Sequence, residues 1–211
     1  SDLTREQVRT TILTELMELL QIDGAIISTV EKIESTPNLV RAIGCWQNID
    51  NTKLKTNEGL SGFIISNCKP YVNFCASRDP YFAYPELLSN LITLAGIPLV
   101  TEGQTIGSII VGSTRVMSED ELRLLKTIGD MAASAIHRSD LYEQTCAQAK
   151  ELKLAYDATL EGWAHALELR DKETQGHSLR IANMTLELAK RMGVEEENLD
   201  NIRRGALLHD I

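Results

Sequence analysis

Residues 93–113 read TLAGIPLVTEGQTIGSIIVGS. Two runs of mostly apolar and β-branched residues, 93–100 and 105–113, flank the tetrapeptide Thr101-Glu102-Gly103-Gln104. β-branched side chains favour strands, and glycine can take a positive φ at no steric cost, so the stretch predicts a β-hairpin that turns at Gly103. The other elements of the first 140 residues can be placed around this hairpin.

The residues before the hairpin predict a helix and three more strands. Residues 3–20 carry apolar side chains at helical spacing, as in an amphipathic helix. Its stripe consists of Val8, Ile12, Leu16 and Leu19, with Leu13, Met17 and Leu20 beside it. Two β-rich runs, 25–32 and 39–46, flank turn-forming residues and predict a second hairpin, and residues 71–75 add a short strand. This order predicts an α+β fold in which helices cover an antiparallel sheet.

Residues 57–73, NEGLSGFIISNCKPYVN, together with the hairpin resemble a GAF domain. The resemblance rests on the G-x-x-G spacing of Gly59 and Gly62, on the strand that follows, and on the order of the elements. It implies a sensor domain over residues 1–140. GAF domains bind a small molecule, or nothing, between the sheet and the segment that here comprises residues 74–91.

That segment and one tryptophan supply the candidate ligand pocket. Its predicted lining consists of Trp46, Phe74, Cys75, Arg78, Tyr81 and Tyr84. Aromatic rings with one arginine would suit a planar or anionic ligand, and the alternative is that the rings only fill a core. The Cys-His pair of bilin-binding relatives and the Asn-Lys-Phe-Asp motif of mammalian cyclic-nucleotide-binding GAF domains are both missing, so the ligand stays unknown.

A long helix is predicted after the sensor. From Glu119 to Leu169 the chain has no proline, and residues that are mostly apolar or small recur at alternating spacings of three and four. The positions are Leu125, Ile128, Ala132, Ala135, Ser139, Tyr142, Cys146, Ala149, Lys153, Tyr156, Leu160, Trp163 and Leu167. A sustained period of 3.5 predicts a coiled coil, with residues 141–169 as linker, and hence a homodimer through this helix. The alternative is a helix whose first half packs on its own sheet.

Two histidines near the end of the chain are candidate metal ligands. His209 follows Leu199, Ile202 and Ala206 at helical spacing, and His177 lies on one helical face with Ile181, Met184 and Leu188, which turns both histidines inward. Glu173 and Asp210 place a carboxylate beside each. Neutral imidazole and ionised carboxylate are the usual nitrogen and oxygen ligands of divalent metals. From spacing alone, hydrogen-bonded core histidines explain the pattern as well.

Residues 155–178, AYDATLEGWAHALELRDKETQGHS, and 203–211, RRGALLHDI, resemble the HD-GYP family. The resemblance implies the start of an all-α HD domain over residues 170–211 and a cluster of divalent metals, iron or manganese, that hydrolyses cyclic di-GMP. Its metal ligands would be Glu173, His177, His209 and Asp210, with His209 and Asp210 also catalytic. Further motifs of the family would follow Ile211, so we expect activity in a longer parent protein and neither activity nor bound metal in this chain alone.

Composition excludes several other classes. The net charge of −9 disfavours nucleic-acid binding, because phosphates would be repelled. Four cysteines without C-x-x-C spacing predict reduced thiols rather than disulfides or a zinc site. No apolar run reaches the roughly 20 residues of a membrane span, and no signal-peptide pattern is present, so we expect a cytoplasmic protein.

The sequence is therefore compatible with three functions. The first is a bacterial signalling protein in which a GAF sensor, acting through a dimeric helix, controls a metal-dependent cyclic di-GMP phosphodiesterase. The second is a non-catalytic module that senses a ligand and dimerises, with a degenerate HD output domain. The third is an HD-type nucleotide phosphohydrolase of other specificity.

Overall fold

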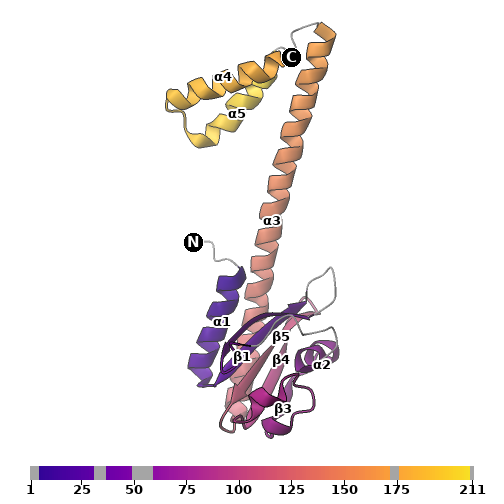
Figure 1. Cartoon of the computed structure of the whole chain (residues 1–211), viewed down its shortest axis with the longest axis vertical. Coiled ribbons are helices and arrows are strands. Elements are labelled where there is room, and N and C mark those ends of the chain that lie inside the picture. The colour runs from indigo at the N-terminus through magenta and orange to yellow at the C-terminus, as the bar shows by residue number, and fades with distance from the viewer. Residues whose placement is uncertain (1–4, 31–36, 49–58, 172–175, 210–211) are drawn as a thin grey trace. The chain divides into compact units, whose positions relative to one another are not determined.

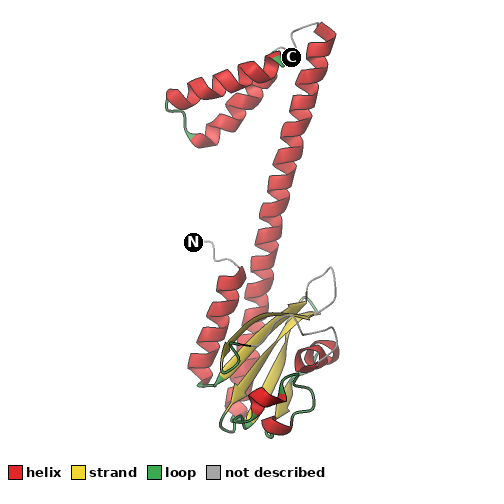
Figure 2. Ribbon diagram, in the orientation of Figure 1, coloured by secondary structure: helices red, strands yellow, loops and turns green. Residues whose placement is uncertain are grey.

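The computed structural model describes residues 5–30, 37–48, 59–171 and 176–209, which fall into two compact units, 1–142 and 143–211. Figure 1 labels the elements and Figure 2 colours them by type. The first unit contains α1 (Arg5–Leu20), β1 (Gly24–Val30), β2 (Pro37–Gly44), α2 (Gly59–Asn67), β3 (Tyr71–Asn73), η2 (Ala76–Arg78), η3 (Pro85–Leu88), β4 (Thr93–Thr101), β5 (Gln104–Ser113) and the first part of α3 (Glu119–Asp171).

The five strands form one antiparallel sheet in the order β2-β1-β5-β4-β3. The predicted hairpin is confirmed: Thr101 pairs with Gln104, and the two residues between them, Glu102 and Gly103, have φ values of 51° and 76°. Positive φ at both central residues is the tight turn that matches the twist of paired strands. The predicted α+β fold is confirmed as well.

The second hairpin is also present, with one correction. β1 and β2 pair from Gly24 opposite Gly44 onward, so β2 ends two residues before the predicted limit. Trp46 therefore lies in a turn after the strand rather than in it. Of the predicted turn residues 34–38, the first three lie outside the described residues, whereas Pro37 and Asn38 belong to β2 and pair with Val30 and Thr29.

Each face of the sheet buries a separate apolar cluster. Successive side chains of a strand point to opposite faces, so Ile27 and Ile109 join one cluster while Ile26 and Ile110 join the other. The first cluster contains Leu13, Leu16 and Leu20 of α1 with Leu125, Ala132, Ala133 and Ile136 of α3. The second contains Leu60 and Ile64 of α2 with Trp46, Phe82, Leu88 and Leu91.

Helix α1 is amphipathic as predicted, but the buried stripe is rotated. Leu13, Leu16 and Leu20 are at most 1% exposed, whereas Leu19 is 61% exposed. The 3.6-residue repeat allowed either stripe, and contact with the sheet and α3 selects the one that ends at Leu20.

The second unit contains the rest of α3, α4 (His177–Arg191) and α5 (Glu196–Leu207). Its small core consists of Ala164, Ala182 and Leu207 with Ala206 packed against them. Met184 and Leu188 are 73% and 58% exposed, so the expectation that they face inward with His177 is wrong for the described residues. α4 instead turns Ser178, Ala182 and Ala189 inward, because these small side chains allow close helix contact.

The long helix is confirmed, and α3 runs for 53 residues. Its heptad positions have different environments. Leu125 and Ala132 are buried in the first unit's core, so the first half of α3 does pack on its own sheet. Leu160 is buried in the second unit, whereas Tyr142 and Trp163 are 55% and 60% exposed. Of the helices that the structure describes, none combines the length and apolar character needed to cross a bilayer.

Candidate metal centre

The predicted histidine ligands lie close together in the second unit. His177 is the first residue of α4, and His209 lies two residues beyond the end of α5. Their ring centroids are 5.9 Å apart, with an angle of 45° between the ring planes. With a metal–nitrogen distance of about 2.1 Å, two imidazoles that share one ion have centroids roughly 5 Å apart. The two rings therefore fit a common metal ion or neighbouring ions.

The tautomer of His209 is set by a backbone carbonyl. Its Nδ1 lies 2.9 Å from the oxygen of Ala206, and a carbonyl can only accept a hydrogen bond. Nδ1 therefore carries the proton, and in the neutral ring the lone pair belongs to Nε2. Metal-binding histidines commonly donate their second nitrogen in this way, which fixes the ring and raises its basicity.

Ion pairs between α3 and α5 hold the helix that leads to His209. Arg204 Nε lies 2.8 Å from Asp157 Oδ1, and its guanidinium stacks 4.9 Å from the centroid of the Tyr156 ring. Two further pairs join Arg203 to Glu161 and Lys153 to Asp200. Ion pairs that stay partly exposed contribute little stability singly, but this series fixes the register of α5 on α3.

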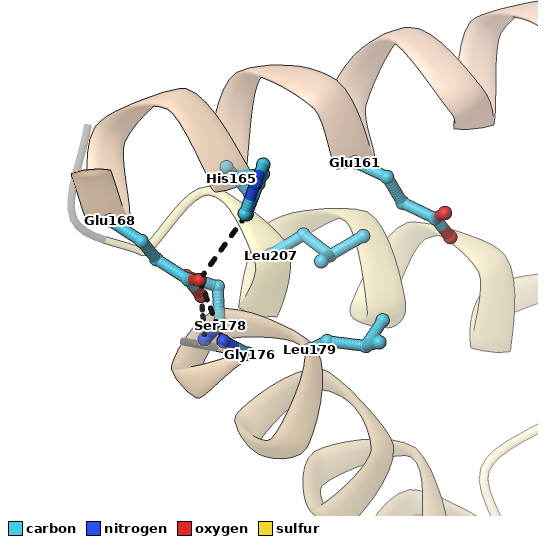
Figure 3. Close-up of a pocket in the computed structure, with 8 residues that line it drawn as sticks. Glu161, His165, Glu168, Gly176, Ser178, Leu179 and Leu207 are labelled. Atoms are coloured by element: carbon cyan, nitrogen blue, oxygen red, sulfur yellow. Dashed lines mark hydrogen bonds and ion pairs between the residues drawn. The ribbon is translucent and has the colours of Figure 1, made fainter. Parts of the chain in front are cut away.

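Glu168 of α3 holds the start of α4 (Figure 3). Its two carboxylate oxygens each accept a hydrogen bond of 2.8 Å, one from the backbone N–H of Gly176 and one from that of Ser178. The bonds from Ser178 and Gly176 are the main reason that the pKa of Glu168 is lowered to about 2. His165 Nδ1 is 3.8 Å from the same carboxylate. Glu168 was not among the residues predicted from the sequence.

These residues line a pocket of about 210 Å³ between α3, α4 and α5. Figure 3 shows Glu161, His165 and Glu168 on α3, Leu179 on α4 and Leu207 on α5 around it. The other two predicted ligands, Glu173 and Asp210, lie outside the described residues. Within the described ranges, no three histidine, cysteine or carboxylate side chains gather as a metal cluster would require. Two imidazoles with those two carboxylates would suit iron, manganese or zinc.

Most of the residues predicted to line the sensor pocket are exposed. Of its six predicted residues, only Trp46 is fully buried, and its ring lies 5.2 Å from that of Phe82. Tyr84 packs partly against the same cluster. The other four residues, Phe74, Cys75, Arg78 and Tyr81, are exposed.

The sheet makes room for Trp46 through two glycines. A Cβ on Gly112 would lie 2.6 Å from Trp46 Cη2, and one on Gly24 would lie 3.1 Å from the same ring system. The indole Nε1 donates to the carbonyl oxygen of Leu87 at 3.4 Å, which joins the ring to η3. The indole therefore fills space beneath residues 74–91, as expected if the rings form a core.

Asp79 organises the segment over the sheet, and it was not predicted. It is 6% exposed and accepts bonds from Tyr71 Oη at 2.6 Å and Asn73 Nδ2 at 2.7 Å. It also accepts the backbone N–H groups of Tyr81 and Phe82 at 3.0 Å each. Burial, together with the bond to Asp79, raises the pKa of Tyr71 to about 12. The pattern Asp79-Pro80, a common turn former, was the available signal.

Comparison with known proteins supports two families. The GAF domain model matches residues 4–136, and the HD domain model matches residues 174–211. None of the curated proteins matches the chain. The solved structures that resemble it do so at low identity and therefore show the fold alone.

Three of these structures belong to different kinds of protein. The GAF domain/HD domain protein from Geobacter sulfurreducens is 15% identical with a TM-score of 0.56, covering 66% of this chain and 95% of that one. The GAF domain of a Coxiella burnetii phosphoenolpyruvate-protein phosphotransferase is 20% identical with a TM-score of 0.57, covering 67% and 87%. The type II free methionine-R-sulfoxide reductase from Thermoplasma acidophilum is 16% identical with a TM-score of 0.53, covering 64% and 95%.

Proposed function

The chain belongs to the GAF domain family through residues 4–136, and from this premise we propose that it is the sensing and first output part of a GAF-regulated cyclic di-GMP phosphodiesterase of the HD-GYP type. A GAF domain joined to an HD domain is the arrangement of a signalling protein. Residues 1–140 would bind a small molecule, α3 would carry the signal, and the HD residues would contribute to the metal site.

The observation that carries the proposal is the approach of His177 and His209. The two residues are 32 positions apart in sequence, one at the start of α4 and the other just beyond α5, yet their ring centroids lie 5.9 Å apart, and the bond to Ala206 places the lone pair of the neutral His209 ring on Nε2. Neither is a core histidine: His177 is half-buried and His209 is exposed, so the expectation that both rings turn inward is wrong for His209, and the approach of the two imidazoles needs a reason other than packing. Metal binding supplies that reason.

Within a complete HD domain, the residues of this chain would have distinct roles. His177 and His209 would hold divalent ions through ring nitrogens, Asp210 would hold them and act in catalysis with His209, and Glu173 would hold a further ion. When bound, such ions polarise a phosphoryl oxygen and lower the pKa of a bound water, which is the chemistry that phosphodiester hydrolysis needs. The glutamate and aspartate assignments come from the family resemblance.

The experiment is hydrolysis of cyclic di-GMP by a protein that joins these residues to a complete HD domain. The metal-loaded wild type is assayed against cyclic di-GMP and against other nucleotides, with a series of small-molecule additives. Turnover that is lost together with bound metal in His209→Ala supports the proposal. A metal-loaded protein that leaves cyclic di-GMP intact under all conditions refutes it, and cleavage of another nucleotide would instead favour the broader HD phosphohydrolase function.

A second candidate function, sensing and dimerisation without catalysis, is favoured by the exposed apolar side chains of α3. Tyr142, Ala149, Tyr156 and Trp163 follow one another at seven-residue intervals, and Leu152 lies between two of them at coiled-coil spacing. Leu152 is 71% exposed and Trp163 is 60% exposed. A parallel homodimer along this seam would cover them. This seam keeps four of the thirteen heptad positions predicted from sequence, Tyr142, Ala149, Tyr156 and Trp163, and leaves out those, such as Leu160, that are buried within the chain.

A further inference from the structure

Helix α4 begins without a capping side chain of its own. Its N-cap residue is Gly176, with φ 79° and ψ 17°, and a glycine has no side chain that could accept a bond from the first N–H groups. The first turn of any α-helix leaves such donors without partners inside the helix. Here Glu168, which lies on α3, accepts two of the donors at 2.8 Å.

The two donors lie on either side of His177. One carboxylate oxygen accepts from the residue before it and the other from the residue after it, so the backbone on both sides is tied to α3 (Figure 3). His177 is the first residue of α4, where helices fray most readily. The two bonds therefore fix the position and direction of the histidine at the point where the helix alone would hold it least.

The opposite histidine is held independently. His209 is fixed by its bond to the Ala206 carbonyl and by the ion pairs of α5, none of which involves Glu168. A carboxylate that is 6% exposed and uses both oxygens on backbone donors is also well placed beside the positive end of the α4 dipole. Glu168 therefore controls one ring of the pair and leaves the other unaffected.

We propose that Glu168 is a positioning residue for the metal site, which clamps the backbone on both sides of His177 and so sets its ring opposite His209. The inference rests on the proposed function in one respect, which is that the two histidines are paired in order to bind metal. It predicts that changing Glu168 displaces His177 alone.

The test uses the 211-residue chain and the variant Glu168→Gln. Glutamine keeps the shape but has one acceptor, so its NH₂ group must face one of the two backbone donors. By NMR, we expect the amide protons of Gly176 and Ser178 to exchange roughly tenfold faster, as the loss of one charge-assisted bond implies. The cross-relaxation between the rings of His177 and His209 should weaken, while the Nδ1-protonated tautomer of His209 persists.

A second readout follows the metal site directly. Added Mn²⁺ broadens the signals of rings that bind it even when binding is weak, and Glu168→Gln should require about tenfold more Mn²⁺ for the same broadening of His177. Glu151→Gln, an exposed change of the same kind on the same helix, should behave like the wild type. Glu168→Asp keeps the charge but is too short to reach both amides, so it should give an intermediate result.

The outcomes separate the two proposals. Unchanged exchange and unchanged ring contact in Glu168→Gln would overturn the positioning role, whatever the metal does. If the wild type shows no Mn²⁺ broadening of either ring, the two histidines do not hold the ion by themselves, as expected for this chain without the family's further ligands, and amide exchange and ring contact alone decide the positioning role. Glu168→Gln is judged unfolded when the second unit's signals are lost while those of the first unit remain. In that case Glu168→Asp decides, by amide exchange, by the contact between the two rings and by Mn²⁺ broadening.

Discussion

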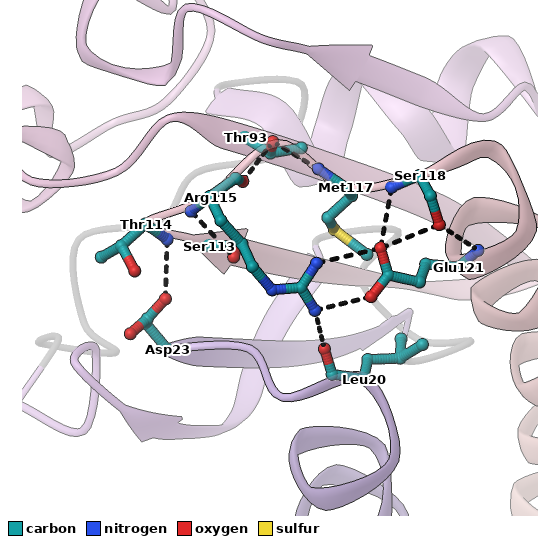
Figure 4. A network of polar contacts seen from close by, with 9 residues as sticks. All are labelled: Leu20, Asp23, Thr93, Ser113, Thr114, Arg115, Met117, Ser118 and Glu121. Atoms are coloured by element: carbon teal, nitrogen blue, oxygen red, sulfur yellow. Dashed lines mark hydrogen bonds and ion pairs between the residues drawn. The ribbon is translucent and has the colours of Figure 1, made fainter.

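Arg115 binds Glu121 through two parallel hydrogen bonds, from Nη2 to Oε1 at 2.6 Å and from Nη1 to Oε2 at 3.0 Å (Figure 4). The same Nη2 donates to the carbonyl oxygen of Leu20 at 2.7 Å. Leu20 ends α1, Arg115 follows β5, and Glu121 lies in the first turn of α3. One guanidinium thus ties the sensor sheet's last strand to the two helices that cover the same face.

The Glu121 carboxylate also caps α3. It accepts the backbone N–H of Ser118 at 2.7 Å, and the Ser118 hydroxyl in turn accepts the N–H of Glu121 at 3.3 Å. This reciprocal pattern is a capping box, which stabilises a helix start. The bond from Arg115 is the first reason that the pKa of Glu121 is lowered to about 2, and the Ser118 backbone bond is the second.

The first prediction is therefore an acid dependence of the first unit. A carboxyl whose folded pKa is depressed adds stability above its unfolded pKa, about 4.5, and loses that contribution as the pH falls toward 2. The free energy of unfolding should fall less steeply between pH 5 and pH 2.5 in Glu121→Gln than in the wild type. Urea unfolding followed by Trp46 fluorescence, in a Trp163→Phe background, measures it.

The control for this prediction is Glu119→Gln. Glu119 lies in the same first turn of α3, but its side chain is 88% exposed and pairs with Arg123 of the same helix. In Glu119→Gln, the free energy of unfolding should fall between pH 5 and pH 2.5 as steeply as in the wild type. Equal slopes in all three proteins would show that Glu121 is not coupled to folding.

The second prediction concerns Asp79, which satisfies four donors above the sheet. Asp79→Ala should lower the free energy of unfolding of the first unit by about 3 kcal/mol, because it leaves several buried donors without an acceptor. Tyr71→Phe removes one donor and leaves the carboxylate its three other bonds, so we expect a loss of about 1 kcal/mol. Urea titration of both variants gives the comparison, and similar losses in the two would contradict the network.

The third prediction tests dimerisation with a matched pair of leucines on α3. Leu152 lies on the proposed seam, whereas Leu154, two positions later, lies on the outer face of the same heptad. Both are exposed, at 71% and 62%, so neither change should disturb the fold of the monomer. Leu152→Asp should weaken the dimer by at least tenfold in dissociation constant, because it buries a charge in each copy.

Light scattering over a range of concentrations measures this effect. Leu154→Asp should retain the mass of the wild type. A wild type that is monomeric throughout, or two variants with equal masses, would rule out this seam. Leu160→Asp is unsuitable for the purpose, since Leu160 is 2% exposed within the chain and its replacement would disrupt the second unit.

The local elements were predictable because their signals lie within short stretches. The hairpin at residues 93–113 and the start of α3 at Glu119 depend on turn and cap residues a few positions apart. Burial of Trp46 was not predictable, since it depends on two glycines, Gly24 and Gly112, that only the sheet brings together. The order of strands could be expected from the family resemblance but not from the residues themselves.

The candidate metal site was also predictable only in part. The spacing of His177 and His209 from nearby apolar residues identified them as candidates, but their separation of 5.9 Å depends on how α4 and α5 pack. Counting from His177 selected the face with Met184 and Leu188, which is exposed, because periodicity cannot tell which of two faces meets a neighbour. Glu168 was missed because a carboxylate that caps a different helix leaves no local pattern.

The last prediction compares substitutions of three candidate metal ligands in a protein that carries a complete HD domain. His209→Ala should abolish cyclic di-GMP hydrolysis and lower the bound iron or manganese together, because it removes a nitrogen ligand whose orientation the Ala206 carbonyl already fixes. Asp210→Ala should do the same, because the family resemblance assigns Asp210 to the metal site and to catalysis together with His209. Glu173→Ala should retain part of the activity and lose only the metal that it holds. Elemental analysis and turnover, measured on the same preparations, give the result. Full activity in His209→Ala would refute the ligand assignment, and equal losses in Glu173→Ala and Asp210→Ala would refute the smaller role assigned to Glu173.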